Sequence, residues 1–170
     1  MWSTTTLYMT NYTGVKWHIQ GQSMAEFLQQ IKAVVFDLDG TLVDSQLDFT
    51  ELRRRLGWPE HTLILEHLAT LSCAIEKQQA AQIIVDFELE GARNASWMPN
   101  ADLLLKQLKH RQIPMAILTR NMRQATELCM QALDIPIELV LTRDDAPAKP
   151  QPEGLWLIAE RLGVMPDEIL

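Results

Sequence analysis

The sequence is poor in cysteine, since Cys73 and Cys129 are the only two among 170 residues. Two thiols neither build a disulfide framework nor supply the ligand set of a structural zinc site. We therefore expect two buried, reduced cysteines. The sequence also lacks an apolar run of the roughly 18 residues that a membrane-spanning helix needs, and its N-terminus does not resemble a secretory signal. A cytoplasmic protein with no membrane partner is expected.

Basic residues are in the minority: 15 Lys and Arg stand against 22 Asp and Glu, which gives a formal net charge of −7. No stretch gathers enough positive charge to bind the phosphates of a nucleic acid or an anionic membrane surface. Small anions remain compatible with this balance, because one local positive field is enough to bind them. With 47% hydrophobic residues, the chain has the composition of a globular protein with a sizeable core.

Three short apolar runs predict strands, at residues 33–38, 113–118 and 137–142. Segments with helical spacing lie between and after them, at 101–109, 122–133 and 153–162. This alternation is typical of an α/β protein in which crossover helices join parallel strands. We expect a Rossmann-like parallel sheet.

The stretch after the first strand has helical spacing at 47–56, 60–71 and 74–92, and no strand signal interrupts it. Such an insertion would lie above the carboxyl ends of the strands, where open parallel sheets bind ligands. We expect a small helical cap at 45–96 on a core formed by 31–44 and 97–170. Residues 1–30 are interpreted as an N-terminal extension, in which Val15, Trp17 and Ile19 alternate as in a short strand. This extension is either an added strand or a start-site artefact.

Two acidic residues, Asp37 and Asp39, stand where the first strand runs into a loop that contains Gly40. Their spacing sends both side chains to one side of an extended chain. Two neighbouring carboxylates repel each other, and a divalent cation shared with a phosphate relieves that repulsion. The pair therefore favours magnesium-assisted phosphoryl chemistry.

The segment DLDGT around this pair resembles the first motif of the haloacid dehalogenase superfamily, in its phosphatase branch with a small helical cap. Thr119 in AILTRN follows the second strand and Lys149 in APAKPQPEG follows the third, in the order that the superfamily shows. The resemblance covers residues 31–170. It implies a Rossmann-like core and a phosphomonoester hydrolase that depends on Mg²⁺.

The resemblance also implies a role for each matching residue. Asp37 would be the nucleophile that takes up the phosphoryl group, and Asp39 would be the general acid and base. Thr119 would donate its hydroxyl to a phosphoryl oxygen, and Lys149 would hold the nucleophile and the phosphoryl charge together. Asp37 and Asp39, the latter through its backbone carbonyl, would bind Mg²⁺. Substrate and phosphate contacts are expected from the loop residues Gly40, Thr41, Arg120 and Asn121.

The last acidic motif of the superfamily, a Gly-Asp element beyond the lysine helix, is missing from this sequence. We interpret Asp167 and Glu168, which follow Pro166, as residues of a first helical turn and not as its substitute. Weaker magnesium binding is therefore expected unless Asp144 or Asp145 takes its place. The core would also be C-terminally incomplete, and the exposed edge of strand one predicts a homo-oligomer, a swapped dimer or poor solubility. The alternative is an incomplete product of a longer gene.

The expected substrate is a small phosphorylated metabolite such as phosphoglycolate, which the resemblance allows but does not select. The cap contains one basic cluster, Arg53–Arg55. Successive helical positions fan around the axis by about a hundred degrees, so at most one or two of these side chains can face the site. They form either a solvated face or a site for an acidic leaving group. His61 and His67 are expected to be exposed or capping residues, because their spacing puts them on different helix faces.

Other function classes stay open at this point. A phosphomutase of the same superfamily uses the same two aspartates but returns the phosphoryl group to a sugar, and product analysis separates the two. A signalling receiver domain also combines Asp, Thr and Lys on a parallel sheet, but its acceptor aspartate lies near the middle of the domain. A catalytically inactive scaffold is the third alternative.

Overall fold

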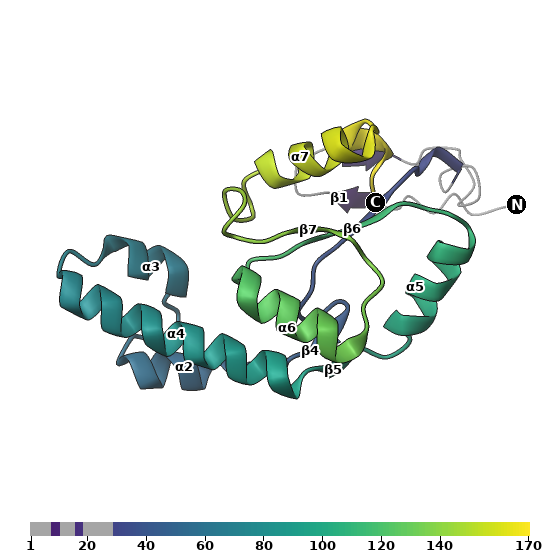
Figure 1. Cartoon of the computed structure of the whole chain (residues 1–170). Helices are drawn as coiled ribbons and strands as arrows, with labels where there is room; N and C mark the ends of the chain where they lie inside the picture. Colours follow the sequence, from purple (N-terminus) through teal and green to yellow (C-terminus); the bar gives the residue numbers. More distant parts are fainter. Residues whose placement is uncertain (1–7, 11–15, 19–28) are drawn as a thin grey trace, which may run out of the picture.

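The computed structural model describes residues 8–10, 16–18 and 29–170 (Figure 1). The strands in these residues are β1 (Tyr8–Thr10), β2 (Lys16–His18), β3 (Val34–Phe36), β4 (Val43–Asp44), β5 (Ser96–Trp97), β6 (Met115–Leu118) and β7 (Leu139–Leu141). The helices are α2 (Phe49–Leu56), α3 (Ile64–Thr70), α4 (Ala74–Asn94), α5 (Ala101–His110), α6 (Arg123–Leu133), α7 (Glu153–Leu162) and the 3₁₀ helix η1 (Pro166–Glu168).

The central sheet consists of three parallel strands in the order β3-β6-β7. In this sheet β6 lies in the middle, with Val35 opposite Ala116 on one side and Val140 opposite Ile117 on the other. The α/β fold with a parallel sheet is thereby confirmed. Each strand is shorter than its apolar run, and the remaining apolar residues of each run lie in the loops that lead in and out of the sheet.

Alternate strand positions pack on opposite faces of this sheet. On one face Phe36 and Ile117 pack in a cluster with Leu105 of α5, and on the other face Leu118 packs with Ile158 of α7. Figure 1 shows α7 on one side of the strands and α5 and α6 on the other. Burial on both faces explains why the strands are continuous apolar runs without polar alternation.

The helices α2, α3 and α4, which we call the helical insertion, lie beside the core, and α4 runs back along α6 (Figure 1). The insertion has its own small apolar cluster, which includes Leu52, Ile84 and Phe87. Helix α3 begins at Ile64 and not near residue 60 as expected. The reason is a turn after Pro59, whose carbonyl accepts a hydrogen bond from the amide of Thr62 at 3.0 Å.

Two short strands stand at the base of the helical insertion, where the sequence shows no strand signal. β4 and β5 pair antiparallel, with Val43 opposite Trp97 and Asp44 opposite Ser96. They join the two chain segments that connect the insertion with the core. Strands of two residues cannot show an alternating pattern, and their pairing partners are far apart in the sequence, so local periodicity could not predict them.

The edge of β3 that the sequence leaves unpaired has a partner in the structure. After η1 the chain runs parallel to β3: the amide of Val35 donates to the Leu170 carbonyl at 2.8 Å, and the Leu170 amide donates to the Ala33 carbonyl at 3.0 Å. The expectation of an exposed edge is therefore wrong for residues 33–35. It failed because η1 turns the chain back toward the sheet. Glu168, placed in a helical turn as expected, forms an ion pair with Lys32 at 2.5 Å.

The N-terminal extension contains one described pairing, between β1 and β2, with Met9 opposite Trp17 in an antiparallel register. Val15 and Ile19, which complete the expected alternation, lie outside the described residues. No helix in the described part of the chain is long and apolar enough to cross a membrane.

The two cysteines differ in burial. Cys129 on α6 is 2% exposed, as expected, but Cys73 is exposed. The expectation of two buried thiols is thus wrong for Cys73. It precedes the first turn of α4 as that helix's N-cap residue, a position that is set by the end of α3 and not by apolar spacing.

Candidate active site

The acidic pair lies in a tight loop at the carboxyl end of β3. The amides of Leu42 and Val43 both donate to the carbonyl of Leu38, at 2.9 and 3.1 Å, and the amide of Gly40 donates to Val43 at 2.8 Å. Gly40 has a φ of 73°, in the left-handed region that glycine adopts at least cost. The glycine of DLDGT is therefore required by this turn. Thr41 is exposed in the same loop.

Asp37 is bound by the lysine that the sequence assigns to the site. The ammonium nitrogen Nζ of Lys149 lies 2.7 Å from Asp37 Oδ2, and Asp37 Oδ1 accepts a hydrogen bond from the Leu38 amide at 2.8 Å. The Lys149 side chain is 7% exposed, whereas that of Asp37 is 38% exposed. The pair thus places a buried cation against a carboxylate that solvent or a ligand can reach.

Asp39 is held at both carboxylate oxygens. Oδ1 accepts a hydrogen bond from the hydroxyl of Ser45, and Oδ2 accepts one from Nδ2 of Asn121 at 2.5 Å. Burial raises the pKa of the Asp39 carboxyl above its ordinary value of 3.8; the hydrogen bonds from Ser45 and Asn121 oppose that rise, and the charge of Asp37 adds to it. The two aspartates therefore have different environments.

Thr119 and Asn121 lie together in the loop that follows β6. Thr119 is 4% exposed, and its amide donates to the Leu141 carbonyl at 2.9 Å. Its Oγ1 accepts a hydrogen bond from the amide of Asn121 at 3.1 Å. A hydroxyl that accepts in this way keeps its own hydrogen for a second partner. Arg120 forms an ion pair with Glu66 of α3 at 2.5 Å, and its contact with substrate stays a prediction.

Two charged residues beside this loop were not predicted from the sequence. Glu88 of α4 is 8% exposed, and it forms an ion pair with Arg143, which follows β7, at 2.5 Å. Burial raises the pKa of Glu88 above its ordinary value of 4.5, and the charge and hydrogen bond of Arg143 oppose that rise. A sequence signal for Glu88 exists: with Ile84, Phe87 and Gly91 it occupies the i, i+3, i+4, i+7 positions of one buried helix face.

A cavity of about 270 Å³ lies between the helical insertion and the loop after β6. Its polar lining comes from Asn121, Arg120, Glu88, Glu66 and Arg53. Its apolar lining comes from α2, α3, α4 and the residue before α3: Phe49, Leu52, Leu63, Ile64, Leu65 and Ile84. Because Asn121 both lines this cavity and binds Asp39, the cavity adjoins the acidic pair.

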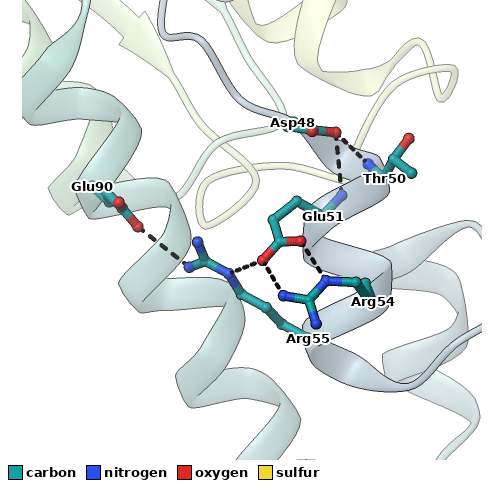
Figure 2. Close-up of polar contacts among 6 residues, drawn as sticks. All are labelled: Asp48, Thr50, Glu51, Arg54, Arg55 and Glu90. Atoms are coloured by element: carbon teal, nitrogen blue, oxygen red, sulfur yellow. Dashed lines mark hydrogen bonds and ion pairs between the residues drawn. The ribbon is translucent and has the colours of Figure 1, made fainter.

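The three arginines of α2 separate in the way that their helical spacing requires. Arg53 lines the cavity and donates to the main-chain carbonyls of Thr62 and Phe49, at 2.9 and 3.0 Å. Arg54 and Arg55 instead bind Glu51, and Arg55 also reaches Glu90 of α4, as Figure 2 shows. Two of the three therefore belong to an exposed ion-pair cluster.

The histidines of the insertion have no metal-binding arrangement in the described residues. The ring of His67 packs edge-on against Trp58, with centroids 4.5 Å apart. His61 is exposed.

The acidic pair can be tested for its fit to Mg²⁺. Among the described residues, no group of three or more His, Cys, Asp or Glu side chains is placed to hold a metal ion. Mg²⁺ is nevertheless often bound through one or two carboxylates, with water and substrate phosphate completing its shell. A carboxylate has lone pairs for several partners, so Asp37 and the main-chain carbonyl of Asp39 fit a site of that kind.

Asp144 and Asp145, considered above as substitutes for the missing acid, are engaged at the start of α6. Asp144 Oδ2 accepts from the amide of Arg123 at 2.8 Å. Asp145 Oδ2 accepts from the amide and the hydroxyl of Thr142, both at 2.7 Å, and from the Arg123 guanidinium at 2.5 Å. Their carboxylates stabilise this loop, and the structure gives no support to a metal role for them.

A family model of haloacid dehalogenase-like hydrolases matches residues 31–170. The chain belongs to the haloacid dehalogenase-like hydrolase family. The match begins just before β3 and includes every residue of the candidate site, together with the whole helical insertion.

Relatives within this family are only distantly similar to the chain. A haloacid dehalogenase-like hydrolase domain-containing protein of Arabidopsis thaliana is 28% identical over 83% of this chain, and the chain spans 62% of that protein's length. A phosphoglycolate phosphatase of Photorhabdus laumondii is 26% identical over 86% of this chain and 73% of its own length. A solved haloacid dehalogenase-like hydrolase of Streptococcus pneumoniae has the same fold, with a TM-score of 0.62, 23% identity, and coverage of 83% of this chain and 74% of the other.

Proposed function

We propose that the chain hydrolyses phosphate monoesters through an aspartyl-phosphate formed on Asp37, with Mg²⁺ as cofactor. The observation that carries this proposal is the buried ammonium of Lys149, 2.7 Å from the half-exposed carboxylate of Asp37. A compact cation at this point offsets the repulsion between a carboxylate nucleophile and a phosphate dianion. Membership of a hydrolase family supports the same chemistry.

The proposed reaction has two displacements. In the first, an oxygen of Asp37 bonds to phosphorus while the ester P–O bond breaks, and Asp39 gives a proton to the departing alkoxide. In the second, water attacks the phosphorus of the aspartyl-phosphate, its proton passes to Asp39, and inorganic phosphate leaves Asp37 restored. The raised pKa of Asp39 supports its proton-transfer role, since a larger share of protonated acid is then present near neutral pH.

Three further residues complete the proposed site. Thr119 retains its hydroxyl hydrogen for a phosphoryl oxygen, and the exposed loop of Gly40 and Thr41 borders the place of the phosphate. Asn121 holds Asp39 in the orientation described above. Mg²⁺, held by Asp37 and the main-chain carbonyl of Asp39, would supply electrostatic stabilisation of the phosphoryl charge.

The substrate that this proposal assigns is a small phosphorylated metabolite, for which phosphoglycolate is the first compound to test. Two features support a small leaving group. The cavity beside Asn121 has a volume of about 270 Å³, and the Photorhabdus laumondii relative, which matches 86% of this chain, is a phosphoglycolate phosphatase. The helical insertion, whose helices supply most of the cavity lining, would then act as the cap that contacts the leaving group.

The test is hydrolysis of a panel of phosphate esters, with Mg²⁺ and with excess chelator, by the wild-type chain and by Asp37→Asn. The proposal requires release of inorganic phosphate that depends on Mg²⁺ and is lost in Asp37→Asn. Full turnover by that variant would overturn the nucleophile assignment. Transfer of the phosphoryl group to a second hydroxyl of a sugar phosphate, without release of phosphate, would instead identify a mutase.

A further inference from the structure

A largely buried ion pair connects the helical insertion to the loop that carries Asn121. The side chains of Glu88 and Arg143 are 9% and 18% exposed, and their charged atoms lie 2.5 Å apart. The second carboxylate oxygen of Glu88 accepts a hydrogen bond from the Met122 amide at 3.3 Å. Burying two charges is costly unless each finds several partners. Here both side chains have further partners, and these partners all belong to one loop, residues 120–122.

Arg143 binds that loop at two more points. Its guanidinium donates to the main-chain carbonyl of Arg120 at 3.1 Å, and its own amide donates to the carbonyl of Asn121 at 3.2 Å. Together with Glu88 on Met122, these contacts fix three consecutive residues, 120–122. The side chain of the middle residue, Asn121, is the one that binds Asp39 Oδ2 at 2.5 Å.

We propose that Glu88 and Arg143 are positioning residues, which act through the 120–122 loop to hold the Asn121 amide against the Asp39 carboxylate. The inference rests on the proposed function for its kinetic consequence, since Asp39 is there the acid and base. Its structural content is independent of that function. Neither residue belongs to a predicted motif, and both act from outside the acidic pair, Glu88 from α4 and Arg143 from the end of β7.

A second ion pair also joins the insertion to the core and provides a matched control. Glu66 of α3 binds the guanidinium of Arg120 at 2.5 Å, but this pair is exposed, with side chains 48% and 40% accessible. Glu66 binds the side chain of Arg120 and not the main chain of the loop. If the Glu88–Arg143 pair merely attached the insertion to the core, loss of either pair would have the same effect on the side-chain amide of Asn121.

The first experiment is kinetic and compares Arg143→Lys, Glu88→Gln and the control Glu127→Gln. Nη1 of Arg143 donates both to Glu88 and to the Arg120 carbonyl. The lysine ammonium stands one bond closer to the main chain, so Arg143→Lys keeps a cation but draws it back from these two acceptors. A displaced catalytic group costs turnover more than binding, so we expect kcat to fall about ten-fold in Arg143→Lys with KM within about two-fold. Glu127→Gln removes an exposed ion pair with Arg123 within α6, away from the cavity, and should leave both parameters within about two-fold.

The second step tests whether Arg143 acts through Asn121. In an Asn121→Ala background the contact with Asp39 is already gone, so adding Arg143→Lys should lower kcat by less than about two-fold further. A full ten-fold loss in that background would show that Arg143 acts by another route, and it would overturn the proposal. Equal losses in Glu127→Gln and Glu88→Gln would overturn it as well.

The third measurement needs no activity. In ¹⁵N-labelled protein, the side-chain amide signals of Asn121, assigned by their disappearance in Asn121→Ala, should move in Arg143→Lys and Glu88→Gln but not in Glu66→Gln. Glu88→Gln is nearly isosteric and keeps an acceptor for the Met122 amide, so it serves if Arg143→Lys fails to fold. Unmoved signals in a folded variant refute the positioning role, whereas moved signals in a chain that hydrolyses no ester refute only the proposed function.

Discussion

Nζ of Lys149 reaches Oδ2 of Asp37 from the loop before α7, so that a buried ammonium and an accessible carboxylate lie 2.7 Å apart at the end of β3. The two residues come from distant parts of the chain. They meet because β3 and β7 are parallel strands of one sheet, on either side of β6, and the loops after parallel strands lie at the same sheet edge.

The first prediction concerns this pair. Lys149→Met should lower the hydrolytic rate by about a hundred-fold or more, because removal of one preorganised charge from a transition state costs that much. The fold should survive, since the carboxylate left behind is accessible to water and the new side chain fills a similar volume. Steady-state kinetics and a thermal melt measure the two effects. An active Lys149→Met enzyme would contradict the role assigned to the pair.

Residues at strand ends were the predictable part of the site. Asp37, Thr119 and Lys149 each follow an apolar run, and parallel topology alone brings such positions to one edge. Two other expectations were wrong because they considered only local patterns. The free edge of β3 and the lack of strands between Leu42 and Trp97 were both inferred from local patterns. The pairing of Val35 with Leu170 and of Val43 with Trp97 depends on segments far away in the sequence.

Glu88, Arg143 and Ser45 were not predicted, and the reason is physical. Each is polar and buried or nearly so, and its burial depends on how α4 and the linker before α2 pack on the core. Charged residues are mostly exposed, so a sequence interpretation assigns them to the surface by default. The position of Glu88 within an apolar helical stripe was the one available clue, because a charge there must be paired if the helix packs as its spacing indicates.

The second prediction concerns Gly91, where α4 passes the linker that leads into the helical insertion. A methyl group at this position would overlap the Leu47 side chain and lie 3.1 Å from the carbonyl oxygen of Ser45, whose hydroxyl binds Asp39. Alanine normally stabilises a helix by about 1 kcal/mol over glycine. We expect Gly91→Ala instead to destabilise the protein by about 1 to 3 kcal/mol, as overpacking does, and to lower activity.

Urea unfolding measures this change, and Gln78→Ala, at an exposed position of the same helix, is the control that should remain within about 0.5 kcal/mol of wild type. A stabilised Gly91→Ala protein would mean that the linker moves aside without cost. In that case the linker would not hold Ser45 in a fixed position.

The third prediction is a pH dependence of stability that comes from Asp145. Burial acts to raise the pKa of this carboxyl, but the hydrogen bonds from Thr142 and Arg123 outweigh it and hold the pKa below its ordinary value of 3.8. A carboxyl whose pKa is depressed on folding stabilises the protein above its unfolded pKa and loses that contribution as pH falls through its folded pKa. Asp145→Asn should therefore be less stable at neutral pH by about 1 to 2 kcal/mol, typical of lost hydrogen bonds to a charge.

The difference between wild type and Asp145→Asn should be constant from pH 7 to pH 5. It should shrink as pH falls below about 4, where the carboxyl begins to take up a proton in the unfolded chain, and disappear as pH falls through the lower pKa of the folded state. Urea unfolding at a series of pH values measures it. A difference in stability that grows toward low pH would have the wrong sign, and it would show that the charged carboxylate of Asp145 does not stabilise this loop.

The fourth prediction uses the unequal burial of the two thiols. Cys129 is 2% exposed, and burial, assisted by the charge of Asp39, raises the pKa of its thiol to about 11. Because the thiolate is the reactive form, Cys129 should resist thiol reagents at neutral pH while the exposed Cys73 reacts. An Ellman titration of native protein should thus count one thiol, and Cys73→Ser should count none until denaturant is added. Rapid reaction of Cys129 in the folded Cys73→Ser protein would contradict this prediction. It would show that α6 opens readily from the sheet, where Cys129 belongs to the same apolar cluster as Phe36 and Ile117.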